Sequence, residues 1–344
     1  MKNNKKAKKP KKVCPTKTSD ADMHKYPFVS ICTPTFNRRP FFPIIVECVL
    51  SQTYPQDRME WIIIDDGTDP IADLCEGIPN VKYYRYLEKM TLGKKRNLMH
   101  EKTRGDILVY FDDDDYYPPT RVAHAVEMLE NNKTALCAGS SEMYIFFKHI
   151  MKMYKFGPYG PNHATAATFA FRKELLQQTR YDEHASVAEE KAFLKNYTIP
   201  FVQLDPLQTI LVFSHIQNSF DKKVLLDSPN AFVNLSSKSV ASFVTSGKIM
   251  KFFMVDIDAL LNAYHAGDVR NKPDVLKQLE EMKLKREEQQ LQMKTSMTKK
   301  LSDMTGIEVA SLYEQKLSEA NIRIHTLLRE NLEMKTQIST KANP

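Results

Sequence analysis

Four consecutive carboxylates, Asp112 to Asp115, are the residues of this sequence best suited to chemistry. They follow an apolar, partly β-branched run, Ile107–Phe111, which predicts a strand buried on both faces, and Pro118-Pro119 prevents that strand from continuing. In an extended segment side chains alternate, so Asp112 and Asp114 point the same way, about 7 Å apart. Such a pair could hold Mg²⁺ or Mn²⁺, which in turn bind substrate phosphates. The alternative is a solvated acidic loop.

The elements around these carboxylates predict a doubly wound α/β fold with a mostly parallel sheet. Strands are expected at 28–33, 61–65, 81–86 and 107–111. Helices are expected between them at 43–50 and 93–103. Pro34 is expected to stop the first strand. Three of the four strands end in polar clusters, and in such sheets ligands bind beyond the carboxyl ends of the strands, so we expect these clusters to form one site.

Two common ways of binding phosphate are disfavoured by the sequence. There is no GxGxxG after the first strand and no GxxxxGK[ST] anywhere, which argues against a dinucleotide fold and a P-loop. We therefore expect phosphate to be held by a metal ion on the aspartates together with cations such as Lys94 or Arg96.

Five short motifs occur in an order that resembles the inverting, nucleotide-sugar-dependent glycosyltransferases of family 2, which have the GT-A fold. They are VSICTPTFN (29–37), LSQTY (50–54), IIIDDGTD (62–69), KKRN (94–97) and FDDDD (111–115). Each motif alone is weak, but the ordered set is specific, and the resemblance covers roughly residues 27 to 220. It implies transfer of a sugar from a nucleotide-diphosphate sugar, above all a UDP-sugar, to an acceptor hydroxyl with inversion.

The resemblance implies a donor-binding role for residues at the ends of the first two strands. Those of the first strand are Thr33, Pro34, Thr35 and Phe36, which would line the nucleoside pocket, and Asn37 and Arg38 beside them. Asp65 or Asp66 would accept a hydrogen bond from the N–H of uracil. The alternative is turn chemistry for Asp66 and a loop cap for Thr35 and Asn37.

The same resemblance implies a metal site at the acidic cluster. Asp112 and Asp114 would form the DxD pair that holds Mn²⁺ or Mg²⁺ on the diphosphate, and Asp113 would contact the donor. His215 would be a further metal or diphosphate contact, since imidazole is an acceptable third ligand for Mn²⁺. For His215 the alternative is a structural role after an apolar strand.

The second half of the domain is expected to bind the acceptor and supply a base. Thr165–Phe171 is predicted to be a strand that leads into a helix, and the resemblance places the general base at Glu190, with Glu189 beside it. Inversion needs a carboxylate to take the proton of the acceptor hydroxyl. Most relatives have Glu-Asp here, so the extra methylene leaves the position of the base open. The alternative is an acidic pair that stabilises a helix N-terminus. No QxxRW run follows, which favours transfer of a single sugar over polymer synthesis.

Composition and charge limit the kinds of protein that this sequence can encode. The net charge of +7 on 344 residues comes entirely from residues 1–25, which hold nine lysines and two aspartates, 9 − 2 = +7. We expect this segment to be a disordered, solvating tail rather than a dedicated nucleic-acid or membrane contact. The five cysteines are scattered without CxxC spacing, and no signal peptide or membrane-length apolar run is present, so a cytoplasmic protein is expected.

The C-terminal third changes character. We expect a catalytic domain over 26–225, helices packing on it over 226–268, and a helical or coiled-coil region over 269–344. A heptad pattern fits Leu317, Ala320, Ile324, Leu327, Asn331, Met334 and Ile338. This pattern predicts a homodimer through the helix from Leu317 to Ile338, with an amphipathic helix lying on the domain as the alternative.

Partners and competing functions remain open at this point. The expected ligands are a nucleotide sugar and a glycan, protein or small-molecule acceptor. A sugar-phosphate nucleotidyltransferase would also need carboxylates on a metal, but usually carries a glycine-rich basic signature that residues 33–39 lack. A catalytically inactive GT-A module acting as a coiled-coil scaffold is a further alternative, although Asp112, Asp114 and Glu190 are intact.

Overall fold

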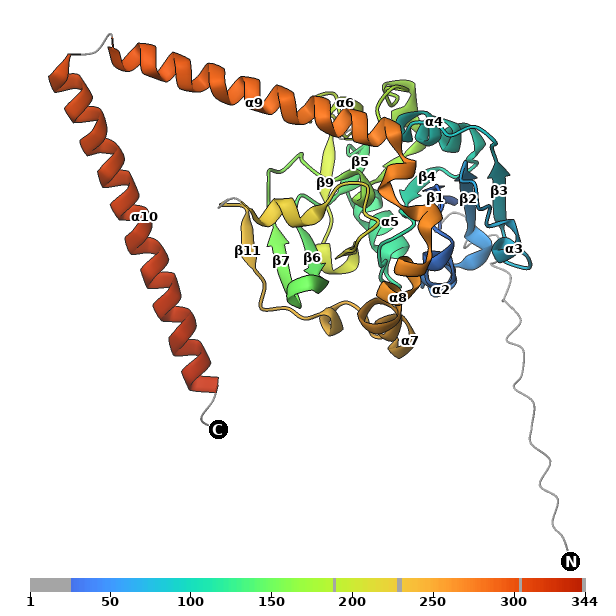
Figure 1. Ribbon diagram of the computed structural model, residues 1–344. Helices are drawn as coiled ribbons and strands as arrows, with labels where there is room; N and C mark the ends of the chain where they lie inside the picture. Colours follow the sequence, from blue (N-terminus) through green and yellow to red (C-terminus); the bar gives the residue numbers. More distant parts are fainter. Residues whose placement is uncertain (1–25, 188–189, 228–230, 303–304, 342–344) are drawn as a thin grey trace, which may run out of the picture. The chain divides into compact units, whose positions relative to one another are not determined.

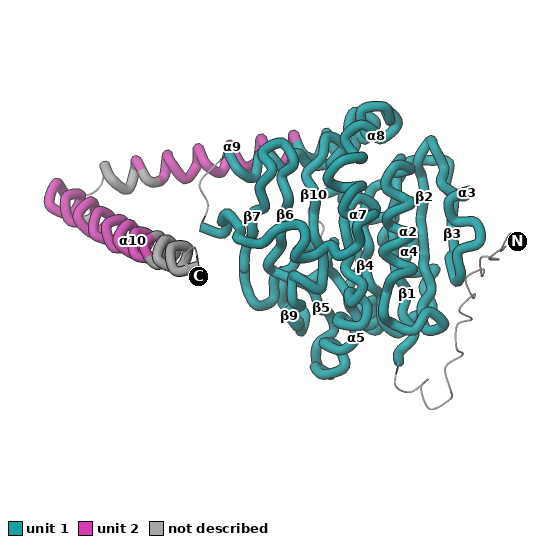
Figure 2. The backbone as a smooth tube through the Cα atoms, turned by 90° about the horizontal axis from the view of Figure 1, so that it is seen from below, with its two compact units in different colours: residues 1–279 teal, residues 280–344 magenta. Residues whose placement is uncertain are grey.

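The computed structural model describes residues 26–187, 190–227, 231–302 and 305–341 (Figure 1). The chain forms two compact units, one ending at Leu279 and the other beginning at Glu280 (Figure 2). The lysine-rich tail expected at 1–25 lies outside the described residues.

The first unit is built on a seven-stranded sheet of order β3-β2-β1-β4-β8-β5-β9. Its strands are β1 Val29–Thr35, β2 Met59–Asp65, β3 Val81–Arg85, β4 Ile107–Tyr110, β5 Cys137–Gly139, β8 Ala170–Arg172 and β9 Phe201–Gln203. The first four run parallel, β8 is antiparallel to both β4 and β5, and β9 is parallel to β5. The predicted α/β class with a mostly parallel sheet is therefore confirmed.

Helices cover both faces of this sheet. One apolar core includes residues of α2, Phe42–Leu50, and α5, Arg121–Asn131, while the other includes Met99 of α4, Leu92–Lys102. Neighbouring strand residues alternate between the two cores: Ile31 packs in the first and Cys32 in the second. This alternation explains the continuous apolar runs of the central strands. A short helix, α3, spans Ala72–Cys75.

A second sheet of order β10-β6-β7-β11 was not anticipated from the sequence. Its strands are β6 Met143–Phe147, β7 Lys152–Phe156, β10 Leu211–Ser214 and β11 Val233–Leu235. A single bridge between Tyr116 and Leu211 joins it to the segment that follows β4. The stretch 226–268, expected to be helical, contains α7 Gly247–Lys251 and α8 Ile257–Ala263 but also the edge strand β11. The three residues of β11 are too few to show the alternation of a strand in the sequence.

Two local expectations were wrong. Pro34 does not end β1, which continues to Thr35 in register with β2. Pairing with β4 stops at Cys32, so the end of β1 has a partner on one side only, where a residue without an N–H is tolerated. The strand expected from Thr165 begins only at Ala170, after a 3₁₀ turn at Ala166–Thr168, and a 3₁₀ helix follows it in place of an α-helix.

The C-terminal region is helical, as predicted. Helix α9 spans Pro273–Ser302 and α10 spans Gly306–Lys341. Leu317, Ile324 and Leu327 of the heptad pattern are more than half exposed. The side chains of Asn331, Met334 and Ile338 lie outside the described part of the chain. In the ranges that the structure describes, no helix is both long enough and apolar enough to cross a membrane.

Candidate active site

A pocket of about 310 Å³ lies at the carboxyl ends of β1 and β4. All four aspartates, Asp112 to Asp115, line it, and so do Pro34, Phe36 and Arg38 from the segment after β1. The polar clusters that end the first and fourth strands thus meet at one site, as the parallel sheet requires.

Asp114 is held in its ionised form. Its Oδ2 atom lies 3.3 Å from Nε2 of His215 and 3.5 Å from Nη2 of Arg38. Burial opposes ionisation, but the hydrogen bond from His215 and the charge of Arg38 outweigh it and keep the pKa of Asp114 well below its usual range. Asp114 therefore presents a negative charge to the pocket.

The flanking carboxyls behave in the opposite way. Burial raises the pKa of Asp113, although Arg38 Nε lies 3.6 Å from its Oδ1. Burial and the charge of Asp114 raise the pKa of Asp115 well above normal. Oδ1 of Asp115 is buried without a hydrogen-bond partner among the described residues. A group of carboxyls that cannot all ionise together would gain from a bound cation.

His215 is engaged by the protein on both ring nitrogens. The backbone N–H of Gln217 donates to Nδ1 at 3.2 Å, and Nδ2 of Asn218 lies 2.8 Å from Nε2. Burial lowers the pKa of His215 to about 4, against the opposing effect of Asp114. In this arrangement the ring positions the Asp114 carboxylate.

Arg96 lies behind the aspartates. Its guanidinium carbon lies 4.6 Å from the ring centre of Tyr110 and 5.3 Å from that of Tyr181, and Nη2 is 3.9 Å from Oδ1 of Asp112. A cation stacked on two rings in a buried position is strongly held. Arg96 is absent from the pocket wall as far as the described residues define it.

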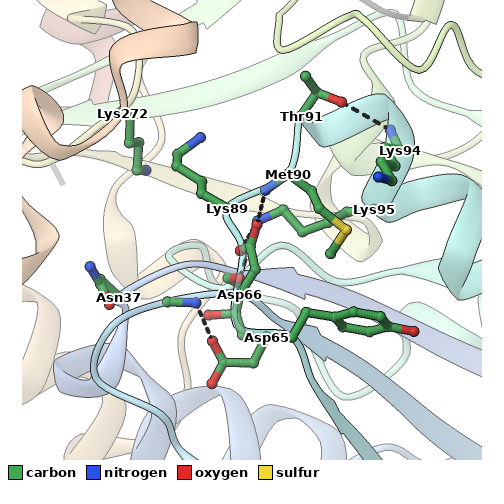
Figure 3. Close-up of polar contacts among 12 residues, drawn as sticks. Asn37, Asp65, Asp66, Lys89, Met90, Thr91, Lys94, Lys95 and Lys272 are labelled. Carbon is green, nitrogen blue, oxygen red and sulfur yellow. Dashed lines mark hydrogen bonds and ion pairs between the residues drawn. The ribbon is translucent and has the colours of Figure 1, made fainter.

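The two neighbouring lysines of α4 have different surroundings. Lys94 is exposed, whereas Lys95 is buried and lines the pocket. Nζ of Lys95 lies 2.7 Å from Oδ1 of Asp66 and donates to the carbonyl of Thr35 at 3.2 Å (Figure 3). One position along a helix turns a side chain by about 100°, so adjacent lysines face different surroundings. The pattern KKRN contains no signal that separates the two.

Asp65 and Asp66 bind the backbone of neighbouring loops. Asp65 accepts hydrogen bonds from the N–H of Gly67 at 2.9 Å, from that of Ile71 at 3.2 Å and from the hydroxyl of Tyr83 at 2.7 Å. Oδ2 of Asp66 accepts from the N–H of Met90 at 2.5 Å (Figure 3). Neither aspartate is among the described residues that line the pocket. In this structure they shape the loops around it.

Three of the six residues expected from the first strand are not among the described residues that line the pocket. Thr33 accepts a hydrogen bond from Nε1 of Trp61 at 2.9 Å. Asn37 has a φ of 53° and donates through Nδ2 to the carbonyl of Ala266 at 2.9 Å. Oγ1 of Thr35 is buried with no hydrogen-bond partner in the described part of the chain. Pro34, Phe36 and Arg38 are the ones that reach the pocket.

The expected base lies elsewhere in the structure. Glu190 begins α6, Glu190–Phe193, and is not among the described residues that line the pocket. Its charge acts on Tyr197, whose pKa is raised by burial first and by Glu190 second. Glu189 lies outside the described residues.

Several residues of the pocket were missed by sequence reasoning. They are the lysines Lys89, Lys95, Lys222 and Lys272. Lys272 lies just before α9, far beyond the motifs, in a lysine-rich part of the sequence where no pattern distinguishes it. Only its burial, with 7% of the residue exposed, reveals it.

The donor set suits a hard divalent cation. Several carboxylates face one pocket, and Asp115 contributes an orphaned buried oxygen. Within the described ranges, no three His, Cys, Asp or Glu side chains converge closely enough to hold a metal ion by themselves. Mg²⁺ and Mn²⁺ are commonly held by one or two carboxylates with water and substrate phosphates, so two aspartates are a sufficient protein contribution.

Residues 30–188 match the model of the family described as glycosyl transferase family 2. The chain is 30% identical over 117 residues to the glucosyl-dolichyl phosphate glucuronosyltransferase of Haloferax volcanii, covering 33% of this chain and 37% of that protein. It is 29% identical over 126 residues to an uncharacterised glycosyltransferase of Rickettsia bellii, covering 34% of this chain and 18% of that protein. The matches thus span less than half the length of either relative.

Among solved structures, one similar chain is the mannosyltransferase PcManGT from Pyrobaculum calidifontis, in complex with GDP-Man and Mn²⁺. The identity is 15%, the TM-score is 0.45, and the match covers 76% of this chain and 77% of that chain.

Proposed function

Because residues 30–188 match the model of glycosyl transferase family 2, we propose that this chain transfers a single sugar from a nucleotide-diphosphate sugar to an acceptor hydroxyl. UDP-sugars are the proposed donors, and inversion at the anomeric carbon is the proposed outcome. The acceptor is a glycan, a protein or a small molecule.

One observation carries the proposal: carboxylates and cations face each other in the same pocket. Asp112 to Asp115 line one part of it, and Arg38, Lys89 and Lys272 contribute positive charge. Carboxylates suit a divalent metal, and ammonium or guanidinium groups suit phosphate oxygens. A metal-bound diphosphate is the ligand that uses both kinds of group at once.

Asp112 and Asp114 are the proposed holders of Mg²⁺ or Mn²⁺. When bound, such an ion would offset the negative charge that develops on the leaving diphosphate. His215 and Arg38 keep Asp114 ionised and oriented, which is the state in which a carboxylate binds a cation. Phe36, which lines the pocket, offers a ring surface to the base or sugar.

Glu190 is the proposed general base. Its carboxylate would take the proton of the acceptor hydroxyl on the face of the sugar opposite the leaving diphosphate. In this proposal the acceptor binds near the start of α6, where Glu190 lies.

The test is thermal unfolding of the full chain with UDP, GDP, CMP and ADP, each with and without Mn²⁺. A ligand at about 100 times its Kd should add about 2.7 kcal/mol to the free energy of unfolding. For a unit of this size that corresponds to a rise in Tm of roughly 5 °C. We expect UDP with Mn²⁺ to give the largest rise.

Two variants separate binding from chemistry. Asp114→Asn should abolish the response to UDP with Mn²⁺, because it removes the ionised metal ligand. Glu190→Gln should keep the full response and lose sugar transfer to an acceptor. Absence of a response to every nucleotide in the wild-type chain would overturn the proposed enzyme and favour an inactive scaffold.

A further inference from the structure

The segment from Tyr264 to Gln278, here called the strap, lies beyond the family domain and yet forms part of the pocket wall. Lys272, Asp274 and Val275 of the strap line the pocket, although the family match ends at residue 188. The pocket is thus completed by residues that the family model does not contain.

The first half of the strap is fastened to the loops that follow β1 and β2. Asn37 donates to the carbonyl of Ala266 at 2.9 Å, and Nη1 of Arg38 donates to that of Gly267 at 3.3 Å. The hydroxyl of Tyr264 donates to Asp69 at 2.9 Å. A Cβ at Gly267 would lie 2.1 Å from Oε1 of Gln217, so a larger residue here would have to displace that side chain. The strap therefore has a defined position over the site.

The second half is fastened to other residues that line the pocket, Ser186 and Lys89. Oγ of Ser186 donates to Asp274 at 2.7 Å, and the N–H of Ser186 donates to Oε1 of Gln278 at 2.8 Å. Lys89 forms an ion pair with Asp274. Lys89 is therefore already paired, as Lys95 is with Asp66.

Lys272 differs from these lysines because its hydrogen-bond partner among the described residues is an uncharged hydroxyl and not a carboxylate. Its Nζ has one hydrogen-bond partner among the described residues, Oγ of Ser219 at 2.8 Å. An ammonium group has three N–H donors, so two remain. Burial and the charge of Arg38 lower its pKa to about 7, against the opposing effect of Asp113 and Asp114. An anionic ligand would favour the protonated form, so a buried amine with spare donors gains from binding one.

We propose that Lys272 binds the diphosphate of the donor, so that the strap is part of the donor site. This inference rests on the proposed function. The side chains of Lys272 and Lys89 enter the same pocket from different segments (Figure 3). Phosphate oxygens accept charge-assisted hydrogen bonds of the kind that Lys272 still offers.

The experiment is titration calorimetry of the full chain with inorganic pyrophosphate, UDP and GDP, in wild type and in Lys272→Met. We expect Lys272→Met to weaken all three about 10- to 100-fold, because a hydrogen bond to a charged group is lost in each. Lys277→Met is the matched control: Lys277 lies in the same strap, at the start of α9, is exposed and does not line the pocket in the described structure. It should bind all three as wild type does.

A separate titration with Mn²⁺ alone distinguishes ligand binding from a merely structural role. Removing a positive charge near Asp113 and Asp114 should leave Mn²⁺ affinity unchanged or raise it, while pyrophosphate affinity falls. A loss of both affinities would mean that the variant has damaged the site and would overturn the assignment. Lys272→Gln, which can still donate to Ser219, serves as the neutral variant if Lys272→Met does not fold.

The remaining outcomes separate the two proposals. If UDP, GDP and pyrophosphate each bind Lys272→Met as tightly as they bind wild type, the role of Lys272 is overturned. The proposed glycosyltransferase function then still stands. Binding of pyrophosphate but of no nucleotide, lost in Lys272→Met, supports Lys272 as a phosphate ligand and overturns the nucleotide-sugar donor. Absence of all binding in wild type overturns both.

Discussion

His100 of α4 lies in the apolar layer beneath the pocket, with Nε2 2.6 Å from the hydroxyl of Tyr110. The ring of Phe171 meets it edge to face, with ring centres 5.5 Å apart. Burial and the charge of Arg96 lower the pKa of His100 to about 3. The folded protein therefore keeps this side chain neutral, while the unfolded chain protonates it near pH 6.5.

This difference predicts a loss of stability in acid. A folded pKa below the unfolded value means that the unfolded state binds the extra proton, so the stabilisation is complete above about pH 6.5 and falls as the pH drops toward 3. Between pH 6.5 and 5 this one group should cost about 2 kcal/mol. His100→Gln should remove that part of the slope in urea unfolding followed at several pH values.

The exposed His149 provides the control, since His149→Gln should leave the slope unchanged. An unchanged slope in His100→Gln would contradict the assignment of this acid sensitivity to His100.

At the scale of single residues, the candidate site could be predicted in part from the sequence. The aspartates after β4 were recognisable because four carboxylates at the end of an apolar strand are unusual, and Phe36 and Arg38 followed from the same motif order. Lys95 and Lys272 were not recognisable. The role of a lysine in this site depends on its burial and on the groups to which its N–H donors are already bonded. Both are properties of the folded chain.

Among the secondary-structure elements, α4 is placed by a close contact at its first turn. The N–H of Gly93 donates to the carbonyl of Ala185 at 2.8 Å, and a Cβ at Gly93 would lie 2.0 Å from the carbonyl oxygen of Asp182. The helix that presents Lys95 to the pocket therefore packs directly on the 182–185 loop. Any side chain at position 93 must push them apart.

Gly93→Ala should destabilise the protein by about 1 to 3 kcal/mol, because the methyl group meets backbone that cannot turn away. The matched control is Gly247→Ala in α7, where no atom lies within 4 Å of the new Cβ. Alanine is the better helix former, so this variant should be unchanged or slightly more stable. Denaturant midpoints of the two variants give the comparison, and equal midpoints would contradict the contact.

The central elements were predictable because β1, β2 and β4 are buried on both faces and therefore appear as continuous apolar runs. The strands β5, β8 and β9 have three residues each, which is too short for any periodicity. These strands form by pairing with neighbouring strands of the main sheet. Such pairing is a tertiary contact, which the local sequence does not show. The same holds for β11 at the edge of the second sheet.

For the whole molecule, the helix α10 leads to a prediction about assembly. Ile324 and Leu327 are 52% and 55% exposed and occupy heptad positions a and d. We propose that two chains pair through this helix. Analytical ultracentrifugation should then give twice the mass of one chain.

The variant Ile324→Asp with Leu327→Asp should sediment as a single chain, because buried carboxylates at a and d are costly. His325→Asp, on the outer side of the same helix, should remain a dimer. A single-chain mass for the wild-type protein at micromolar concentration would contradict the pairing.

The strap also has a consequence for how the protein is made. Asn37 and Ala266, which are hydrogen-bonded, are 229 residues apart in the sequence. At about 5 to 20 residues per second, a ribosome needs on the order of ten seconds or more to pass from one to the other. For the later part of that interval, after Asp112 to Asp115 have been made, the nascent chain carries the acidic cluster without the wall that Lys272 and Val275 provide. Translation therefore delivers the acidic half of the pocket before the strap that completes it.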